Sequence, residues 1–234
     1  MAVTPDTIRA IPYFAELDAG ALAELAARTR LRACARGELV LDEGESCDGL
    51  TFVVTGRVKV FKLSADGREQ VVKILGPGHT FNDVPLFDGG ANPASVAALD
   101  ASTVGLIPAT DVHAIVERDR RVTRAVIRLL AARLRALTVL VEDLAFRGVV
   151  ARVARLLLDC AHGDSALLEG AETACTALTQ QQIAGMTGTV REVVQRALKV
   201  LEREGAVRME RARVVVVDVD ALAALAETAA PTLA

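Results

Sequence analysis

The feature that most constrains this chain is an abrupt change of residue pattern at Pro108. From Asp111 to Phe146 the sequence contains neither glycine nor proline, and its apolar residues recur at helical spacing. One long helix is therefore predicted there. Between Leu31 and Pro108, short apolar runs alternate with glycine-rich turns, which is typical of an antiparallel β domain.

Two dipeptides mark expected turns within the β domain. Thr55-Gly56 interrupts an alternating apolar pattern and predicts a hairpin break. Asp66-Gly67 predicts a second hairpin turn, between a strand at 59–63 and a strand at 69–75. The expected strands are therefore short and closely connected.

Six apolar residues in the predicted helix are separated by alternating steps of three and four, the pattern of a coiled-coil seam. They are Ile127, Leu130, Leu134, Leu137, Val141 and Leu144. A seam of this kind is buried against the same seam of a second copy, so it predicts a homodimer interface. The alternative is that the stripe packs only on the chain's own β domain.

A second domain is expected after Arg147-Gly148, because glycine is a poor helix former and suits a hinge. A helix resumes at 149–163, and strand content is expected at Ala174–Ala177. Two further helices and a strand-rich segment at 208–219, interpreted as a wing hairpin, complete this domain. The length of 234 residues suits two globular domains.

The segment 178–207 predicts two helices joined by a tight turn. Thr179 with Gln182, and Thr189 with Glu192, each fit a capping box, so two helix starts are expected ten residues apart. The turn itself is expected at 185–188. Apolar contacts between the helices are predicted from Ile183, Ala184, Val194, Leu198 and Leu201, and Gly205 is expected to end the second helix.

A polar stripe begins this second helix, formed by Arg191, Glu192, Gln195 and Arg196. An arginine in the major groove can donate to guanine O6 and N7, and a glutamate can accept from cytosine N4. The stripe therefore predicts direct reading of G·C pairs, whereas the alternative is an intrahelical salt bridge on a solvated face. The candidate DNA-binding residues are Thr179, Gln180, Thr189, Arg191, Glu192, Gln195 and Arg196, and the candidate phosphate contacts are Lys199, Arg203, Arg208, Arg211 and Arg213.

Charge and hydropathy exclude several classes of protein. The formal net charge is −3, so contact with DNA has to come from a local basic surface rather than from the overall field. No run approaches the ~20 apolar residues of a membrane span, and residues 1–10 lack a secretory apolar core. A cytoplasmic protein without a membrane partner is expected.

No catalytic or metal-binding pattern is present in the sequence. It has no Ser/His/Asp order in a strand-turn-helix context and no phosphate-binding loop, and His79, His113 and His162 lack metal-ligand spacing. The cysteines, at positions 34, 47, 160 and 175, form no Cys-x-x-Cys pair and are interpreted as structural thiols. We therefore expect no enzyme and no metal site.

Three stretches resemble the cyclic-AMP receptor protein/FNR family of transcription regulators, with the likeness running from about Tyr13 to Val219. They are TGRVKVFK (55–62) with GPGHTF (76–81), ARLRALTVLVEDLAF (132–146) and TQQQIAGMTGTVREVVQRAL (179–198). The resemblance implies an α+β chain with a β-roll sensor at 1–110 (a double-stranded β-helix like that of cyclic-nucleotide-binding domains), a dimerisation helix at 111–146 and a winged helix-turn-helix at 147–234. It also implies double-stranded DNA, a second copy, RNA polymerase and a small-molecule effector as partners.

The family pattern R-E-x-x-x-R maps onto Arg191, Glu192 and Arg196, which implies recognition of a TGTGA-like half-site. Two recognition helices of a dimer would then enter successive major grooves of a palindrome. Effector binding in the β-roll would move those helices through the long helix.

The sensor departs from the cyclic-AMP pattern. Members that bind cyclic nucleotide have Gly-Glu for the ribose and Arg-Ser for the phosphate, and these positions hold Asn82-Asp83 and Pro93-Ala94 here. A Thr-Ser pair that contacts adenine becomes Leu137-Thr138. Because a buried phosphate needs a paired cation, cyclic AMP is not expected to bind in the usual way. The candidate pocket residues are Asn82, Asp83, Val84, Pro93, Ala94, Ser95, Leu137 and Thr138.

Other effectors stay open. An apolar cavity of Val84, Leu86, Phe87, Val96 and Leu137 would suit haem, with His79 or a cysteine as axial ligand. Redox sensing through Cys34 or Cys47 and an empty, constitutively competent pocket are further alternatives. A sensor module that acts on a protein partner without touching DNA is the alternative function.

Overall fold

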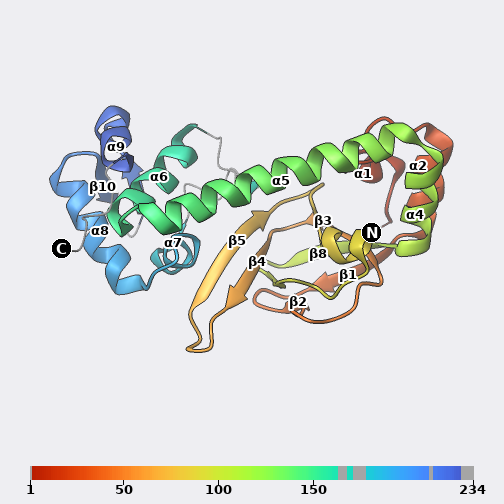
Figure 1. The fold of residues 1–234 in the computed structure, drawn as a ribbon, viewed down its shortest axis with the longest axis horizontal. Coiled ribbons are helices and arrows are strands. Elements are labelled where there is room, and N and C mark those ends of the chain that lie inside the picture. The colour runs from red at the N-terminus through yellow and green to blue at the C-terminus, as the bar shows by residue number, and fades with distance from the viewer. Residues whose placement is uncertain (1, 163–167, 171–177, 211–212, 228–234) are drawn as a thin grey trace. The chain divides into compact units, whose positions relative to one another are not determined.

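Short strands separated by turn glycines form two sheets, and all of their strands except β9 lie between residues 30 and 108 (Figure 1). The computed structural model describes residues 2–162, 168–170, 178–210 and 213–227. One sheet has the order β1-β8-β3-β6 and the other β2-β7-β4-β5-β9. The strands are β1 (Arg30–Cys34), β2 (Leu39–Leu41), β3 (Gly49–Thr55), β4 (Val58–Leu63), β5 (Glu69–Leu75), β6 (Thr80–Phe81), β7 (Ser95–Ala98), β8 (Ser102–Pro108) and β9 (Leu168–Glu169). The predicted β domain is confirmed.

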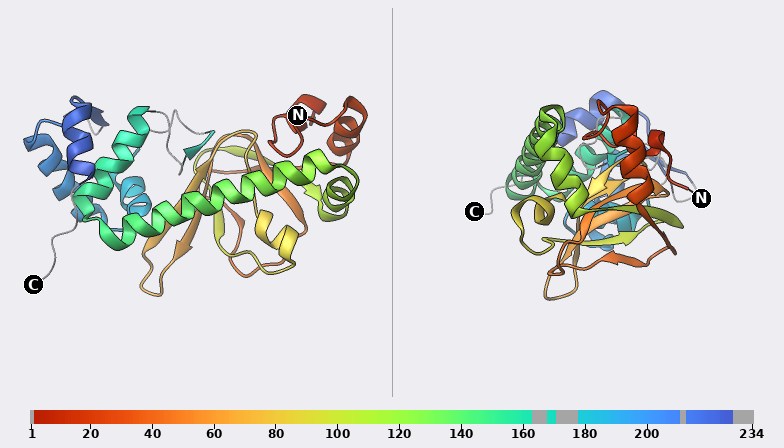
Figure 2. Two further views of the ribbon diagram at one scale, coloured as in Figure 1. Left: turned by 45° about the horizontal axis from the view of Figure 1, so that its top comes forward. Right: turned by 90° about the vertical axis from the view of Figure 1, so that its right-hand side faces the viewer.

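The chain divides into two units, of which the first comprises Met1–Val60 with Ile74–Leu134 and the second Phe61–Lys73 with Arg135–Ala234. Helices α1 (Pro5–Arg9), α2 (Ala19–Arg28), α3 (Asp83–Asp88) and α4 (Ala109–Arg118) belong to the first unit. The long helix α5 (Arg120–Phe146) begins there and continues into the second (Figure 2). The predicted division at 110 and 146 stays a prediction.

Two apolar clusters stabilise the first unit, and β3 contributes to both. Leu50 and Phe52 lie in a cluster with residues of α1, α2, α4 and α5, whereas Val53 lies in a cluster with residues from both sheets. Successive side chains of a strand point to opposite faces, which explains the division. The face of β3 that carries Val53, its inner face, therefore lies toward the space between the two sheets.

The Thr55-Gly56 turn is a corner between sheets, so the predicted hairpin break is corrected. Strand β3 pairs with β8 and β6, while β4 lies in the other sheet between β7 and β5. Gly56 has φ of 77°, a left-handed conformation that other residues rarely adopt. The hairpin at Asp66-Gly67 is confirmed: it joins β4 to β5, and the backbone N–H of Ser64 donates to the Arg68 carbonyl at 2.9 Å.

The single helix predicted from Asp111 to Phe146 is wrong, because the chain breaks at Asp119. That residue is extended, with φ of −119° and ψ of 105°, and ends α4. Its carboxylate accepts a hydrogen bond from the backbone N–H of Arg121 at 2.8 Å, which satisfies a free donor in the first turn of α5. The Arg121 side chain also binds this carboxylate and lowers the pKa of Asp119 to about 2.

The second unit contains α6 (Val149–His162), α7 (Gln180–Met186), α8 (Arg191–Arg203) and the antiparallel pair β10 (Val207–Glu210) and β11 (Arg213–Val216). The predicted helices and wing strands are confirmed. A final helix, α9 (Val219–Ala226), was not expected; Asp218 caps it by accepting from the N–H of Ala221 at 2.9 Å. The strand content predicted at 174–177 lies outside the described residues.

Replacing Gly56 by alanine should destabilise the first unit more than the same change at Gly37. Both glycines have positive φ, 77° and 82°, so both substitutions strain the backbone by ~1–2 kcal/mol. At Gly56 the new Cβ would also overlap Ser102 Oγ and lie 2.7 Å from the Ala101 carbonyl oxygen, whereas nothing lies within 4 Å at Gly37. We expect an additional loss of ~1–3 kcal/mol in the free energy of unfolding for Gly56→Ala, measured by denaturant titration. Equal losses would show that the corner is not crowded.

Candidate nucleic-acid interface and sensor pocket

Helices α7 and α8 pack through the apolar residues that the sequence indicated. Ile183 and Ala184 of α7, and Val194 and Leu201 of α8, are fully buried. The Thr179 cap of α7 is confirmed: its hydroxyl accepts from the Gln182 N–H at 3.2 Å, and the Thr179 N–H donates to Gln182 Oε1 at 2.8 Å. Gly205, with φ of 77°, follows the end of α8 as predicted.

The capping box predicted from Thr189 and Glu192 is wrong. Val190 is the N-cap of α8, and no side chain caps it. The backbone N–H of Thr189 instead donates to the Ala184 carbonyl at 3.0 Å and closes the turn. Thr189 therefore lies one residue before the N-cap, so its hydroxyl is not at the capping position.

Two side chains that no sequence pattern indicates bind the turn between α7 and α8. Arg152 of α6 donates from Nε to the Thr187 carbonyl at 2.8 Å, and Gln70 of β5 donates to the Met186 carbonyl at 3.5 Å. Gly188 has φ of 63°, and a Cβ there would lie 2.8 Å from Leu144 Cδ2. The turn is thus enclosed on several sides. Pattern analysis within a segment cannot find such partners, because they are distant in sequence.

The polar stripe of α8 is exposed on the face opposite its buried residues. Arg191, Glu192, Gln195 and Arg196 are all exposed. Within the described part of the chain, none of these four side chains forms a hydrogen bond or an ion pair, so the intrahelical salt bridge considered above does not form. Their donors and acceptors are free for an external partner.

The residues predicted to contact phosphate differ in whether they already form an ion pair. Arg203 pairs with Glu204 at 3.2 Å, and Arg208 pairs with Glu210 at 2.6 Å, each on the surface. Lys199 and Arg213 are exposed. Arg211 lies outside the described residues. Exposed pairs contribute little free energy and separate readily.

Helix α5 has two apolar faces with different surroundings. Val122 and Val126 are buried in the helix-rich cluster of the first unit, and Leu130 packs partly against it. Five other seam residues are exposed: Ile127 (61 %), Leu134 (66 %), Leu137 (42 %), Val141 (64 %) and Leu144 (38 %). The described chain therefore leaves most of the predicted seam uncovered.

The expected effector residues at the start of α3 are already bonded inside the protein. Asn82 adopts a left-handed conformation with φ of 57°, and its side chain accepts from the Thr51 N–H at 3.0 Å and donates to the Gly49 carbonyl at 2.8 Å. It therefore holds the beginning of β3. Val84, in the first turn of α3, is exposed.

Asp83 is buried, with 3 % of its surface exposed, and has three side-chain donors. Tyr13 and Thr80 donate to Oδ1, the latter at 2.8 Å, and Arg133 of α5 forms an ion pair with Oδ2. Arg133 also donates to the Thr80 carbonyl at 2.7 Å. Burial, reinforced by the Asp83 charge, raises the pKa of the Tyr13 phenol far above its usual value, so Tyr13 stays a donor. No sequence pattern indicates that Tyr13, 70 residues away, completes this cluster.

The second expected effector segment provides no cation. Pro93 and Ala94 precede β7, and Ser95 donates to Asp42 at 2.9 Å while accepting from the Glu43 N–H at 3.0 Å. Leu137 and Thr138 lie in the second unit. Of the expected pocket residues, Asn82, Asp83 and Val84 follow one another at the start of α3. The side chains of Asn82 and Asp83 are already hydrogen-bonded within the protein.

The apolar residues considered as one alternative, a haem cavity, do not lie in a single cluster. Leu86 lies in the helix-rich cluster, whereas Val96 lies in the cluster between the sheets. The ring of His79 is hydrogen-bonded through Nδ1 to the Pro77 carbonyl at 3.1 Å. In the part of the chain that the structure describes, no three His, Cys, Asp or Glu side chains gather as a metal site.

The cysteines differ from one another. Cys34 and Cys47 are free thiols, as expected, and burial raises the pKa of both, which disfavours the reactive thiolate. Cys160 is disulfide-bonded, so the prediction of a free thiol there is wrong. Distance along the chain was the basis for that prediction, and it does not decide whether two sulfur atoms meet in space. Cys175 lies outside the described residues.

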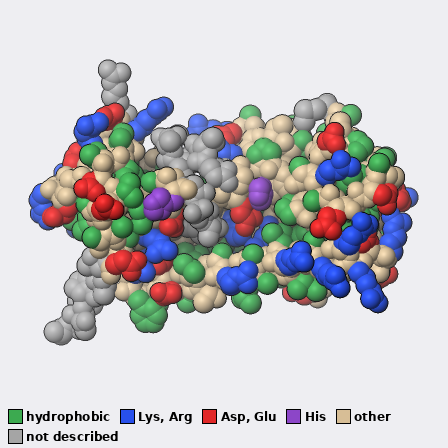
Figure 3. Space-filling model, turned by 90° about the horizontal axis from the view of Figure 1, so that it is seen from above, with side chains coloured by type: hydrophobic (Ala, Val, Ile, Leu, Met, Phe, Trp, Pro, Cys, Tyr) green, Lys and Arg blue, Asp and Glu red, His purple; other side chains and the backbone are tan. Residues whose placement is uncertain are grey.

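Basic and acidic side chains are interspersed on the surface shown in Figure 3, in keeping with a net charge of −3. No helix in the described ranges has both the length and the apolar character needed to cross a bilayer.

Comparison with known proteins identifies both parts of the chain. Residues 31–119 match the model of the cyclic nucleotide-binding domain, and residues 151–225 match that of the Crp-like helix-turn-helix domain. The CRP-like cAMP-activated global transcriptional regulator of Mycobacterium tuberculosis is 31 % identical over 188 residues, covering 80 % of this chain and 84 % of that protein. The cyclic AMP receptor protein of Thermus thermophilus is 30 % identical over 174 residues, 74 % of this chain and 77 % of that protein.

Solved structures share the fold. FixK2 from Bradyrhizobium japonicum aligns with a TM-score of 0.71 at 24 % identity, covering 86 % of this chain and 99 % of that one. A CRP/FNR family regulator from Thermus thermophilus, TTHA1359, aligns with a TM-score of 0.66 at 21 % identity, covering 86 % and 100 %. A cyclic nucleotide-binding-type β-roll, a long helix and a DNA-binding helix-turn-helix thus follow one another here, and the chain belongs to the CRP/FNR family of transcription regulators.

Proposed function

We propose that this regulator is a cytoplasmic homodimer that reads a TGTGA-like palindrome through Arg191, Glu192 and Arg196. The observation that carries the proposal is the exposed, internally unpaired polar stripe at the beginning of α8, opposite a face that is buried. Arginine donors and a glutamate acceptor in that arrangement match the edges of G·C pairs in the major groove. The proposed contact surface also includes Thr179 and Gln180 at the start of α7, Thr189 in the turn before α8, and Gln195 of α8.

Dimerisation follows from the uncovered seam of α5. Exposed leucine, isoleucine and valine side chains at coiled-coil spacing are costly in water, and a second copy of the same helix covers them. Two-fold symmetry would place two α8 helices one turn of DNA apart, as a palindrome requires. In this arrangement residues 1–110 form the sensor, 111–146 the dimerisation helix and 147–234 the DNA-binding domain, with RNA polymerase as the downstream partner.

The sensor does not bind cyclic AMP in the usual way. Relatives are named as cAMP-activated or cyclic AMP receptor proteins, but Pro93-Ala94 supplies no guanidinium for a cyclic phosphate here. Both Asp83 oxygens accept internal hydrogen bonds, and Arg133 is paired with Asp83. A nucleotide would have to disrupt a buried ion pair before it found partners for its own charge.

Arg191→Ala should remove sequence preference without abolishing DNA binding. We expect the preference for a TGTGA-N6-TCACA duplex over a scrambled duplex to fall by ~5–150-fold, the ~1–3 kcal/mol of one bidentate base contact. Lys199→Ala is the matched control, and it should weaken binding to both duplexes equally because phosphate contacts carry no sequence information. Fluorescence anisotropy at fixed salt measures both variants. Equal affinity of the unmodified protein for the two duplexes would sink the proposal.

Leu134→Glu should dissociate the dimer, because it places a charge in the centre of the seam. Leu134 is 66 % exposed within its own chain, so the monomer fold should persist. Val139, on the same helix and 45 % exposed, lies off the seam, and Val139→Glu should leave the dimer intact. Analytical ultracentrifugation distinguishes the two variants, and a Leu134→Glu dimer would contradict the proposed interface.

Cyclic AMP should give no saturable heat when titrated into the protein by isothermal calorimetry. The double variant Pro93→Arg/Ala94→Ser, which introduces the missing cation and hydroxyl, should gain measurable binding. Saturable one-to-one binding to the unmodified chain, as tight as to the variant, would show that another cation holds the phosphate.

A further inference from the structure

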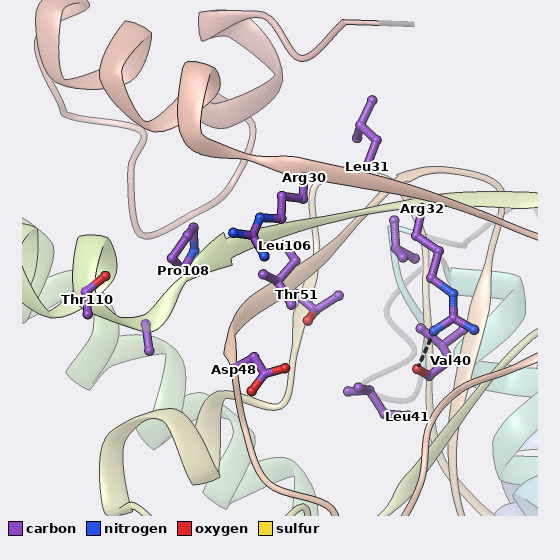
Figure 4. Close-up of a pocket in the computed structure, with 12 residues that line it drawn as sticks. Arg30, Leu31, Arg32, Val40, Leu41, Asp48, Thr51, Leu106, Pro108 and Thr110 are labelled. Atoms are coloured by element: carbon purple, nitrogen blue, oxygen red, sulfur yellow. Dashed lines mark hydrogen bonds between the residues drawn. The ribbon is translucent and has the colours of Figure 1, made fainter.

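A cavity of about 480 Å³ opens on the inner face of the β1-β8-β3 sheet, at residues for which the sequence predicts no function (Figure 4). Its volume falls within the range of small-molecule sites. The walls are mostly apolar, and they come from β1, β2, β3, β8 and the start of α4. The lining residues are Arg30, Leu31, Arg32, Val40, Leu41, Asp48, Thr51, Val104, Leu106, Pro108, Ala109 and Thr110. None of the effector positions at 82–84 or 93–95 is among them.

Strand pairing places three lining residues in one row. Arg30 of β1 is opposite Leu106 of β8, and Leu106 is opposite Thr51 of β3. Directly opposite residues of an antiparallel sheet point to the same face with Cβ atoms ~4.5–5.5 Å apart. A guanidinium and a hydroxyl therefore flank an apolar side chain on the floor of the cavity.

Three polar groups at the cavity have no partner. Thr51 is 3 % exposed, and its hydroxyl makes no hydrogen bond with any residue described. In the same described part of the chain, neither the Arg30 guanidinium nor the Asp48 carboxylate forms a hydrogen bond or an ion pair. Buried polar groups are nearly always paired, so an unpaired hydroxyl in a pocket wall points to a missing ligand or water.

The backbone of Asp48 is held in position, whereas its exposed carboxylate makes no bond within the described part of the chain. Its carbonyl accepts from the Ala109 N–H at 3.1 Å. The adjacent Gly49 lies against β8 so closely that any Cβ would overlap the Ile107 carbonyl. By contrast, Arg32 is already bonded to Glu38 at 2.8 Å and to the Val40 carbonyl at 3.0 Å, as Figure 4 shows for Val40. The free charges at the cavity are thus one cation, Arg30, and one anion, Asp48.

We propose that this cavity binds an apolar α-amino acid as its zwitterion. Arg30 would pair with the carboxylate, Asp48 with the ammonium group, and the side chain would lie on Val40, Leu41 and Leu106. Arg30 and Asp48 are exposed, so water hydrates both charges until a ligand covers them. A simple fatty acid would displace that water without pairing with Asp48, and an amine would do so without pairing with Arg30, whereas a ligand with both charges pairs with both groups. The assignment goes beyond DNA recognition and does not depend on it.

The test is isothermal calorimetry of the intact, DNA-free protein with L-leucine and L-phenylalanine, 4-methylpentanoate and 3-methylbutylamine. The last two compounds are leucine without its ammonium group and leucine without its carboxylate. At least one amino acid should bind one-to-one, and leucine should bind at least tenfold more tightly than either analogue. Equal binding of 4-methylpentanoate would overturn the zwitterion assignment in favour of a carboxylate site, and no saturable binding by either amino acid would overturn the site.

Substitutions of Arg30 and Asp48 test which end of the amino acid each residue binds. Arg30→Gln should weaken amino-acid binding at least tenfold and abolish the preference over 3-methylbutylamine, and Asp48→Asn should abolish the preference over 4-methylpentanoate. Arg36→Gln and Glu117→Gln, which alter exposed charges outside the cavity lining, should bind as the unmodified protein does. Circular dichroism confirms that each variant is folded. Unchanged amino-acid binding by both Arg30→Gln and Asp48→Asn would exclude this cavity as the site. The outcome of the DNA-binding assay on the palindrome has no bearing on this measurement.

Discussion

The buried ion pair between Asp83 and Arg133 is the interaction on which the sensor unit depends. Asp83 begins α3, and Arg133 belongs to α5, so the pair attaches the long helix to the β-roll. Three donors surround a carboxylate that is almost fully buried, which is what keeps its charge tolerable. Removing Arg133 alone would leave an uncompensated charge, a change that typically costs ~3–5 kcal/mol. The same bonding also occupies both carboxylate oxygens of Asp83, a residue that the resemblance places at the effector site.

Attachment of one face of α5 to the β-roll determines which residues the helix leaves exposed on its other face. Val122 and Val126 bury one stripe against the β-roll, and Arg133 fixes the rotation of the helix about its axis. Ile127, Leu134 and Val141 are then directed away from the chain's own core. A helix that packed loosely could turn those residues inward, so the ion pair would keep the seam exposed for the proposed dimer without a rearrangement of α5.

Prediction from sequence succeeded where the signal is local and failed where the partners are distant. The Thr179 cap, the Asp66-Gly67 hairpin and the buried residues of α7 and α8 follow from spacing within a few residues. The break at Asp119 was missed because the apolar periodicity continues through it. The hydrogen bond that begins the new helix, from the Arg121 N–H to the Asp119 carboxylate, leaves no mark in that periodicity. Thr189 was misplaced by one residue because the α7–α8 turn uses its N–H, which spacing does not reveal. The Tyr13–Asp83–Arg133 cluster joins three distant segments, and only the fold brings them together.

Recognition of DNA by a chain with a net charge of −3 has to be local, and the structure shows how. A protein with a strong positive field binds any duplex through its phosphates, and it then has to discriminate against a large nonspecific background. Here Arg203 and Arg208 are partly neutralised by Glu204 and Glu210, whereas the first turns of α8 keep unpaired donors and an acceptor. In the proposed mode of binding, weak attraction to phosphate and strong pairing with base edges would raise the ratio of specific to nonspecific affinity. The acidic residues beside α8 would then contribute to selectivity, by limiting the binding that carries no sequence information.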